Sequence, residues 1–228
     1  MINFKERSKE TEILDKDDLP FEDVKICMKE LNSINTLLGG HKITLQGINY
    51  FYPQKENQFS VCEIGTGGGD NLKAISNKFT KATFIGIDLK QSCIDFAKLQ
   101  YKELNAEWIA SDYSKVQFEG KPDIIFSSLF CHHFSNEQLV VMLSWMKQNS
   151  QKGFFINDLQ RSPLAFYLIK ILTSIFSKSY MVKNDGPISV ARSFRKKDWQ
   201  LFFSKAGINK YSIKWEWAFR YLVVCKND

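Results

Sequence analysis

The sequence lacks any long run of apolar residues. No stretch approaches the roughly 20 consecutive apolar residues that cross a bilayer. Residues 1–18 are highly charged and contain no apolar core of the kind that a signal peptide needs. We therefore expect a cytoplasmic protein without a membrane span. Its 228 residues are enough for one domain with a buried core.

The sequence is also poor in side chains that bind metals. It has five cysteines, an odd number, and no CxxC or zinc-type spacing connects them. Its three histidines are His41, His132 and His133. We therefore expect reduced, mostly buried thiols and no built-in metal site.

Acidic side chains become scarce toward the end of the chain. Residues 1–150 carry 17 basic and 20 acidic side chains, whereas residues 151–228 carry 14 basic and 5 acidic ones, a net charge of +9. A solvated basic face is the plain interpretation. An acidic partner protein, an anionic lipid surface or nucleic acid are the functional alternatives.

What the sequence does contain, from residue 59 onward, is a regular alternation of strand and helix patterns. Apolar strand patterns cover residues 59–64, 83–87, 107–110, 123–127 and 153–157. Alternation of this kind predicts a doubly wound α/β fold, with a parallel sheet covered by helices on both faces. Two further strand patterns, at 211–217 and 219–225, are plausible antiparallel neighbours.

Helical patterns precede the first strand. Apolar spacing predicts one helix over 24–38 and a second, shorter one over 44–52. Residues 1–18 are expected to be loosely ordered. We assign residues 1–55 to an N-terminal helical cap and residues 56–228 to the main domain.

The regular alternation ends after the fifth strand, in a segment that we place at 159–194. Ser162 and Pro163 are typical of a helix start. The helix predicted at 164–176 is apolar on nearly every side, so something must cover it. A packed core and a lid over a hydrophobic, aromatic ligand both fit this pattern. Residues 184–187, Asn-Asp-Gly-Pro, predict a turn.

The run of residues 61–70, Val-Cys-Glu-Ile-Gly-Thr-Gly-Gly-Gly-Asp, carries the strongest chemical signal. It predicts a strand, an acid and a glycine-rich turn that opens a helix. Glycines let the backbone turn tightly and approach a ligand closely. A dinucleotide site would need a small residue where Asp70 stands, so the pattern disfavours NAD. Glu63 is placed to meet a ligand amine.

Polar residues also follow the next three strands. Asp88 ends the second strand, where an acid can hold both hydroxyls of a ribose. Asp112 and Tyr113 follow the third strand, where an acid can accept a hydrogen bond from an adenine amino group. The fourth strand runs into the loop of residues 127–134. All these positions share one sheet edge, where open α/β sheets bind ligands.

Together, these motifs resemble those of class I S-adenosylmethionine (SAM)-dependent methyltransferases, from Phe59 to the C-terminus. The resemblance implies a Rossmann-like, mostly parallel seven-stranded sheet with an antiparallel last strand. It also implies that the glycines cradle the methionine part of SAM, Asp88 the ribose, and Asp112 and Tyr113 the adenine. The residues expected to bind the cofactor are Glu63, Gly65, Thr66, Gly67, Gly69, Asp88, Leu89, Asp112, Tyr113, Ser128 and Leu129, the last two near the sulfonium.

The acceptor is expected to be a small molecule. The His-His-Phe sequence at 132–134 resembles small-molecule members of the family, and the Asn/Asp-Pro-Pro-aromatic motif of base and glutamine methyltransferases is absent. Residues 157–167 and 31–41 are similar to bacterial methyltransferases of aromatic polyketide and alkylresorcinol-type secondary metabolism. We therefore expect O-methylation of a phenolic or quinone-like hydrophobic compound. C-methylation of such a ring is one alternative, and methylation of RNA or protein is another.

A phenol acceptor has a pKa near 10, so a general base would assist the reaction. His132 or His133 could take the phenolic proton, although either could simply pack beneath the loop. Asp158, Arg161 and Phe166 are candidate substrate contacts. The alternatives without a functional role are that Asp158 is a turn residue at the end of a strand and that Arg161 forms an ion pair at the surface. The basic last third could also dock an acidic carrier protein.

Overall fold

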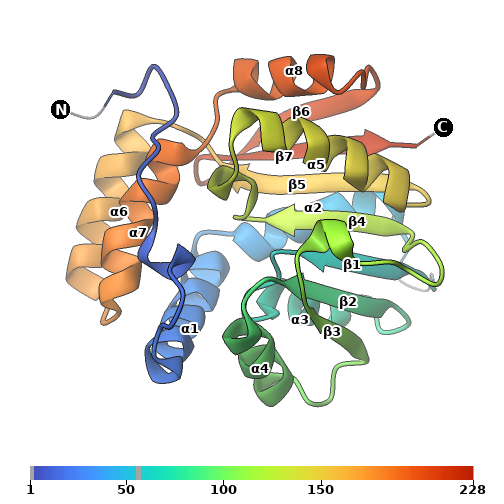
Figure 1. Cartoon of the computed structure of the whole chain (residues 1–228), viewed down its shortest axis with the longest axis horizontal. Coiled ribbons are helices and arrows are strands. Elements are labelled where there is room, and N and C mark those ends of the chain that lie inside the picture. Colours follow the sequence, from blue (N-terminus) through green and yellow to red (C-terminus); the bar gives the residue numbers. More distant parts are fainter. Residues whose placement is uncertain (1–2, 55–57, 228) are drawn as a thin grey trace.

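A computed structural model describes residues 3–54 and 58–227. Within them, a seven-stranded sheet has the strand order β3-β2-β1-β4-β5-β7-β6 (Figure 1). Strand β7 runs antiparallel to its neighbours, and the pairs among β1 to β5 are parallel. The strands are β1 (Ser60–Ile64), β2 (Thr83–Asp88), β3 (Ala106–Ala110), β4 (Ile124–Ser128), β5 (Gly153–Leu159), β6 (Tyr211–Glu216) and β7 (Arg220–Lys226). The predicted α/β fold with an antiparallel last strand is confirmed.

Helices cover both faces of the sheet. On one face, α2 (Gly40–Phe51) and α3 (Asp70–Ser76) bury apolar side chains against it. On the other face, α5 (Asn136–Asn149) and α8 (Lys196–Lys205) do the same. Helix α4 (Gln91–Gln100) packs beside β2 and β3. The strand order reverses between β1 and β4, and a crevice for ligands is expected at this point in such sheets.

The remaining helices stand beyond the edge at which β1 and β4 end (Figure 1). They are α1 (Phe21–Leu37), α6 (Pro163–Phe176) and α7 (Tyr180–Arg192). Their buried side chains form two small apolar clusters outside the sheet. These helices enclose the space next to the predicted cofactor edge.

Local sequence signals fix several helix ends. The Ser135 hydroxyl accepts a hydrogen bond from the Gln138 N–H at 3.2 Å, and the Gln138 side chain accepts one from the Ser135 N–H at 2.8 Å. Ser162 caps α6, with Pro163 in its first turn. Helix α2 starts at Gly40, four residues before the predicted start. Gly39 has a left-handed φ of +77°, which joins α1 and α2 without a loop.

The N-terminal segment is ordered, contrary to expectation. From residue 3 it runs past α7, and the Ser8 N–H donates to the Ala191 carbonyl at 3.0 Å. The Arg192 guanidinium donates to the Glu10 carbonyl at 3.0 Å and to Asp15 at 3.1 Å. This segment ends in a short 3₁₀ helix, η1 (Ile13–Asp15).

The turn predicted at residues 184–187 is also wrong, because these residues lie inside α7. The buried Asp185 carboxylate accepts the N–H groups of Ile13 and Leu14 at 2.7 and 3.0 Å. A helical conformation is what aims this side chain at η1. Tertiary contacts therefore hold a helix through Gly186 and Pro187, residues that locally favour a turn.

Candidate functional site

The glycine turn after β1 has the geometry that a closely held ligand needs. Gly65, Gly67 and Gly69 have left-handed φ angles of +68°, +52° and +78°. A Cβ atom at Gly65 would lie 2.1 Å from the Phe130 ring, and one at Gly69 would lie 2.5 Å from Trp108. At residues 65 and 69, therefore, only glycine fits.

Glu63 supports this turn from behind. Its side chain is fully buried and accepts hydrogen bonds from the Thr66 hydroxyl at 3.0 Å and the Asn71 amide at 2.9 Å. Burial, together with the nearby Asp70, raises the pKa of the Glu63 carboxyl well above its usual range. The structure therefore places Glu63 beneath the turn rather than on its open side.

Asp88 ties the end of β2 to the glycine turn. One carboxylate oxygen accepts the Gly67 N–H at 2.8 Å, and the other accepts the Lys90 N–H at 2.9 Å. Burial raises the pKa of Asp88, while these two N–H groups act in the opposite direction. A carboxylate has about four lone-pair sites, so both oxygens can still accept a ligand hydroxyl. Leu89 follows with its side chain exposed.

The other predicted cofactor residues line the same edge. Asp112 accepts hydrogen bonds from the N–H and hydroxyl of Ser114, both at 2.9 Å. Tyr113 packs edge-on against Phe130, Phe134 and Trp145. The buried Ser128 ends β4. Leu129 follows with a left-handed φ of +53°.

An apolar cavity of about 220 Å³ lies next to this edge, and Leu129 contributes to its lining. Most of its lining residues come from α1, α6 and α7, and many of these are aliphatic. They include Leu31, Ile34, Leu168, Ile169, Leu172 and Val182. Polar side chains in its lining include Glu12, His132 and His133.

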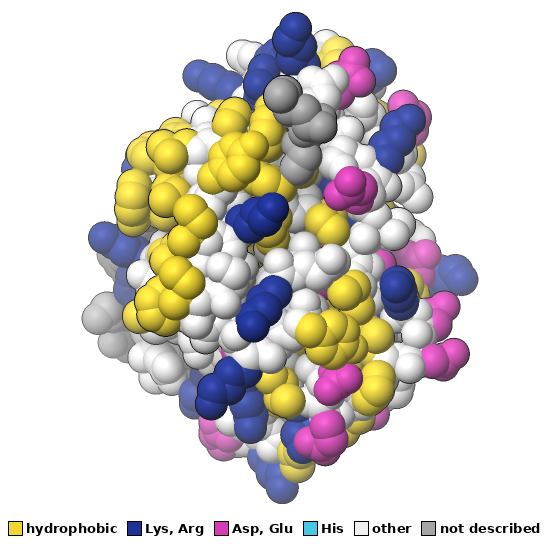
Figure 2. Space-filling model, turned by 90° about the vertical axis from the view of Figure 1, so that its left-hand side faces the viewer, with side chains coloured by type: hydrophobic (Ala, Val, Ile, Leu, Met, Phe, Trp, Pro, Cys, Tyr) yellow, Lys and Arg dark blue, Asp and Glu magenta, His cyan; other side chains and the backbone are white. Residues whose placement is uncertain are grey.

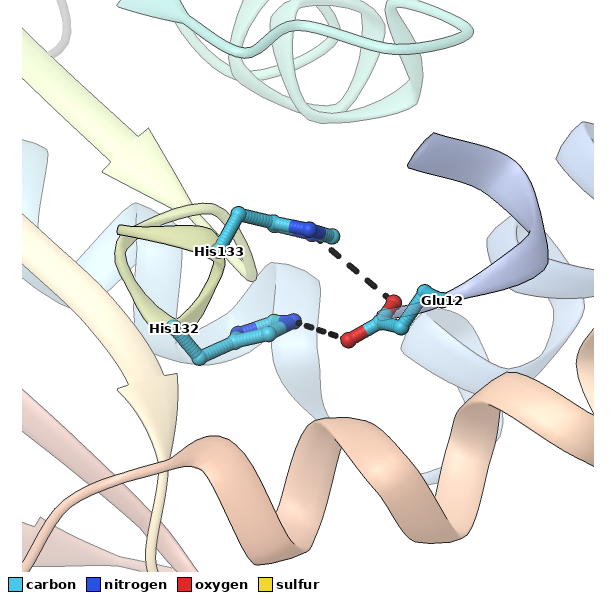
Figure 3. Close-up of side chains that lie close together, drawn as sticks. All are labelled: Glu12, His132 and His133. Carbon is cyan, nitrogen blue, oxygen red and sulfur yellow. Dashed lines mark ion pairs between the residues drawn. The ribbon is translucent and has the colours of Figure 1, made fainter. Parts of the chain in front are cut away.

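These three side chains come together from distant parts of the chain, and both imidazoles face Glu12 (Figure 3). His132 and His133 lie in η3 (Cys131–His133), after β4. Nε2 of His132 is 3.5 Å from one Glu12 oxygen, and Nε2 of His133 is 3.9 Å from the other. The opposite ring nitrogens, Nδ1, lie 2.8 Å from Asp158 and 2.8 Å from Asp15, respectively. Each imidazole is therefore oriented by a carboxylate behind it.

The two histidines differ in burial and charge. The His132 side chain is 2% exposed and that of His133 is 20% exposed. Burial alone would lower the pKa of His132, but Asp158 and Glu12 together raise it to about 9. Burial would raise the pKa of Asp15, but His133 and Arg192 lower it to about 2. His132 is therefore held as a buried cation between two carboxylates.

This ion pair predicts a pH-dependent stability. Because the pKa of His132 is higher in the folded chain than its usual 6.5, protonation stabilises the fold below about pH 6.5, and this contribution is lost as the pH rises through 9. We expect the free energy of unfolding to fall by on the order of 3 kcal/mol across this window. Urea unfolding at pH 6.5 and 9.5 measures the effect. His132→Gln should remove most of the pH dependence, and an equal slope in both proteins would contradict the assignment.

Among the described residues, this cluster of Glu12, His132 and His133 is also the one that could bind a metal ion. Glu12, His132 and His133 each offer one ligand atom, all within 4.8 Å of one another. The sequence-based expectation of no metal site considered the cysteines and the histidines but no carboxylate. One Glu12 oxygen is buried and accepts no hydrogen bond within the described residues, so a cation or a ligand hydroxyl could meet it.

The three candidate substrate contacts lie outside the cavity lining. Asp158 is fully buried behind His132. The Arg161 guanidinium donates to Asp198 at 2.9 Å and to backbone carbonyls such as that of Phe4 at 3.1 Å. Phe166 packs edge-on against Phe4, with ring centroids 5.5 Å apart. They support the walls of the site rather than facing its interior.

Sequence reasoning missed Glu12 and Asp15. Both lie in the charged N-terminal stretch that we expected to be loosely ordered. No local pattern marks them, because their role depends on the contact of this segment with η3 and α7. All five cysteines, by contrast, are buried free thiols, as predicted.

Comparisons with known proteins agree with this geometry. Residues 61–153 match the family described as a methyltransferase domain. A search of curated proteins finds no match. Among solved structures, the plantazolicin methyltransferase BpumL in complex with SAH is similar, with a TM-score of 0.68, 15% identity, and coverage of 91% of this chain and 96% of that one.

Two larger proteins share the fold. Human N-acetylserotonin methyltransferase with SAM has a TM-score of 0.65 and 14% identity over 91% of this chain and 56% of that one. An O-methyltransferase family 2 protein from Planctomyces limnophilus in complex with apigenin has a TM-score of 0.66 and 12% identity, over 92% and 63%. This chain thus spans less than two thirds of either protein.

Proposed function

We propose that this chain, an S-adenosylmethionine-dependent methyltransferase, methylates a hydroxyl oxygen of a hydrophobic, phenolic or quinone-like small molecule. The observation that carries this proposal is the apolar cavity beside the predicted cofactor edge, which is lined by Leu129 and by the cluster of Glu12, His132 and His133. Its walls suit an aromatic ring or an alkyl tail. Its polar cluster suits one hydroxyl group.

The cofactor-binding residues fit the proposal. Gly65, Gly67 and Gly69 form a turn with left-handed φ angles, and Phe130 and Trp108 pack so closely against Gly65 and Gly69 that Cβ atoms there would collide with them. A turn of bare backbone suits the methionine part of SAM. Asp88 would hold the ribose, and Asp112 and Tyr113 would frame the adenine. When bound, SAM supplies an electrophilic methyl group, which the acceptor oxygen takes as the carbon–sulfur bond breaks.

The cavity binds the acceptor and excludes water. Burial of apolar surface is worth roughly 25 cal/mol per Å², so an alkyl tail among the aliphatic walls adds affinity. Holding the acceptor oxygen in line with the methyl group removes much of the entropic part of the barrier. The main contribution of the chain to catalysis is therefore to position the acceptor oxygen against the methyl group.

We assign proton removal to His133. His133 lines the cavity and is the more exposed of the two histidines, and Asp15 lies 2.8 Å from its Nδ1, which leaves Nε2 as the nitrogen available to an acceptor. The hydroxyl proton passes to Nε2 as the oxygen gains the methyl group. Glu12 and Asp15 then stabilise the imidazolium. His132 is less suited, since its raised pKa keeps it protonated near neutral pH.

C-methylation of an activated ring is the nearest alternative, because it would use the same cofactor edge and the same cavity. The likeness of residues 157–167 and 31–41 to enzymes of polyketide and alkylresorcinol-type metabolism supports tailed phenols as acceptors of either reaction. The carboxylate and imidazole groups of the cluster favour a hydroxyl as the polar group of the acceptor.

Methyl-labelled SAM and a series of 4-alkylphenols and alkylresorcinols test the proposal. We expect label in the organic extract, an O-methyl ether by mass spectrometry and NMR, and at least tenfold higher kcat/KM with a longer tail. EDTA should not change the rate, because carboxylates already balance both histidines. Label on ring carbon, in RNA or in protein would contradict the proposal. A loss with EDTA that zinc restores would assign the cluster to a metal.

A further inference from the structure

Helix α6 has two apolar faces, and only one of them is covered. Leu168, Ile169 and Leu172 line the cavity. The outer face exposes five large apolar side chains to solvent. They are Leu164 (59% exposed), Tyr167 (54%), Ile171 (56%), Ile175 (65%) and Phe176 (76%). Exposed apolar areas of this kind are typical of interaction sites.

The exposed face continues to the opening of the cavity. Leu168 and Leu172 are 42% and 40% exposed although they also line the cavity, and Trp217 in the β6–β7 turn is 66% exposed and lines it too. Figure 2 views the molecule from this side, where hydrophobic side chains gather in a broad area next to Lys and Arg side chains. We call these eight residues the apolar face. Three of its members, Leu168, Leu172 and Trp217, are shared with the cavity lining.

The segment that carries most of the apolar face is basic. Residues 159–184 contain Arg161, Lys170, Lys178 and Lys183 and no acid. Lys170, Lys178 and Lys183 are exposed. The neighbouring α1 brings two acids to this segment, and both accept hydrogen bonds from it. Glu30 accepts the N–H of Lys178 at 2.7 Å, and Asp23 accepts the Tyr180 hydroxyl at 3.3 Å.

We propose that the apolar face docks onto the surface of a membrane that contains anionic lipids. Aliphatic side chains would enter the acyl boundary, the lysines would meet the head groups, and Tyr167 and Trp217 would lie at the interface, as is typical of helices that lie in a bilayer surface. A second copy of the chain fits less well, because two faces with the same positive charge would repel each other.

Docking places the cavity opening against the lipid. A hydrophobic acceptor can then pass from the bilayer into the cavity without crossing water. This step rests on the proposed function, whereas docking itself does not. Helix α6 has 14 residues, and no helix in the described parts of the chain is long and apolar enough to cross a membrane. The proposed contact therefore lies along the surface.

Co-sedimentation of the full chain with vesicles tests docking. We expect binding to vesicles of phosphatidylcholine and phosphatidylglycerol that is at least tenfold tighter than binding to phosphatidylcholine alone. Raising the salt concentration should weaken it, since screening shortens the reach of the lysine charges. The double variant I175E/F176E should lose at least tenfold in binding.

The matched control is V141E/L201E. It adds the same charge at exposed apolar positions on α5 and α8, away from α6, and should bind vesicles like the parent. Methylation of a short, water-soluble phenol without vesicles should remain intact in I175E/F176E, which separates failure of docking from failure of the proposed function. Equal binding to neutral and anionic vesicles would overturn the proposal. So would unchanged binding of I175E/F176E, a dimer that this variant dissociates, or binding to an acidic carrier protein but not to vesicles.

Discussion

Replacing His133 by alanine is expected to lower kcat by about 10²–10³-fold while the Kd for SAM changes by less than threefold. The reason is chemical. A positioned general base typically contributes about 10²–10⁴-fold, and Nε2 of His133 is the atom to which we assign the phenolic proton. Single-turnover kinetics and calorimetry with SAM measure the two quantities. The loss should reside in kcat rather than in cofactor binding.

A nitrophenol that is already ionised at the assay pH separates a base from a structural role. With this acceptor there is no proton to remove, so H133A should recover most of the parent rate. Added imidazole should also restore part of the rate on ordinary phenols. A variant that is equally impaired with both acceptors would show that His133 acts only through packing, and unchanged turnover would remove it from the mechanism.

The effect of H133A on kcat is compared with that of H132Q. His132 is held between Asp158 and Glu12 and is nearly inaccessible, so its loss should mainly lower stability at neutral pH. A larger loss of kcat in H132Q than in H133A, again cancelled by the ionised phenol, would transfer the base role to His132.

The fold and the cofactor edge could be predicted from the sequence because their signals are local. The glycine turn is visible in residues 65–69, since the backbone must be left-handed there. The start of α5 is visible in Ser135 and Gln138, whose reciprocal bonds span three residues. The alternation of apolar strands and helices then leaves few topologies to consider.

The polar end of the cavity could not be predicted in the same way. Glu12 meets His132 and His133 only because the N-terminal segment packs between η3 and α7. Residues 184–187 of α7 have the composition of a turn but form a helix. The hydrogen bond that Asp185 accepts from the backbone of η1 outweighs their local preference for a turn. Such contacts join segments far apart in sequence, and neither spacing nor composition records them.

The predicted substrate contacts could not be placed correctly from the sequence either. Arg161 looked available for an acidic group because it follows β5, at the edge where ligands bind. In the folded chain it joins the N-terminal segment to α8, through the Phe4 carbonyl and Asp198. A sequence can place a residue at a strand end, but the direction of its side chain depends on which charges the rest of the chain brings there.

Asp88→Asn is expected to weaken SAM binding by about 100-fold. Charge-assisted hydrogen bonds are worth about 1.5–3 kcal/mol each, and the Asp88 carboxylate accepts N–H bonds on both oxygens. An amide offers only one oxygen, so its NH₂ group would face the N–H of Gly67 or Lys90. One of the two hydrogen bonds that Asp88 accepts from the N–H groups of Gly67 and Lys90 would be lost. The ribose would lose one of the two carboxylate oxygens that could accept its hydroxyls. Calorimetry with SAM and with S-adenosylhomocysteine measures the loss.

The matched control is Asp95→Asn, which removes the same charge from an exposed position on α4, where Asp95 bonds only to the Gln91 side chain. This variant should bind SAM like the parent. Thermal unfolding of D88N without cofactor separates a weakened turn from a lost ligand contact, because a folded D88N with weak SAM binding assigns Asp88 to the site. If D88N and D95N bound the cofactor equally well, Asp88 would not be the residue that holds the ribose. The methyl-transfer site would then have to lie elsewhere on the molecule.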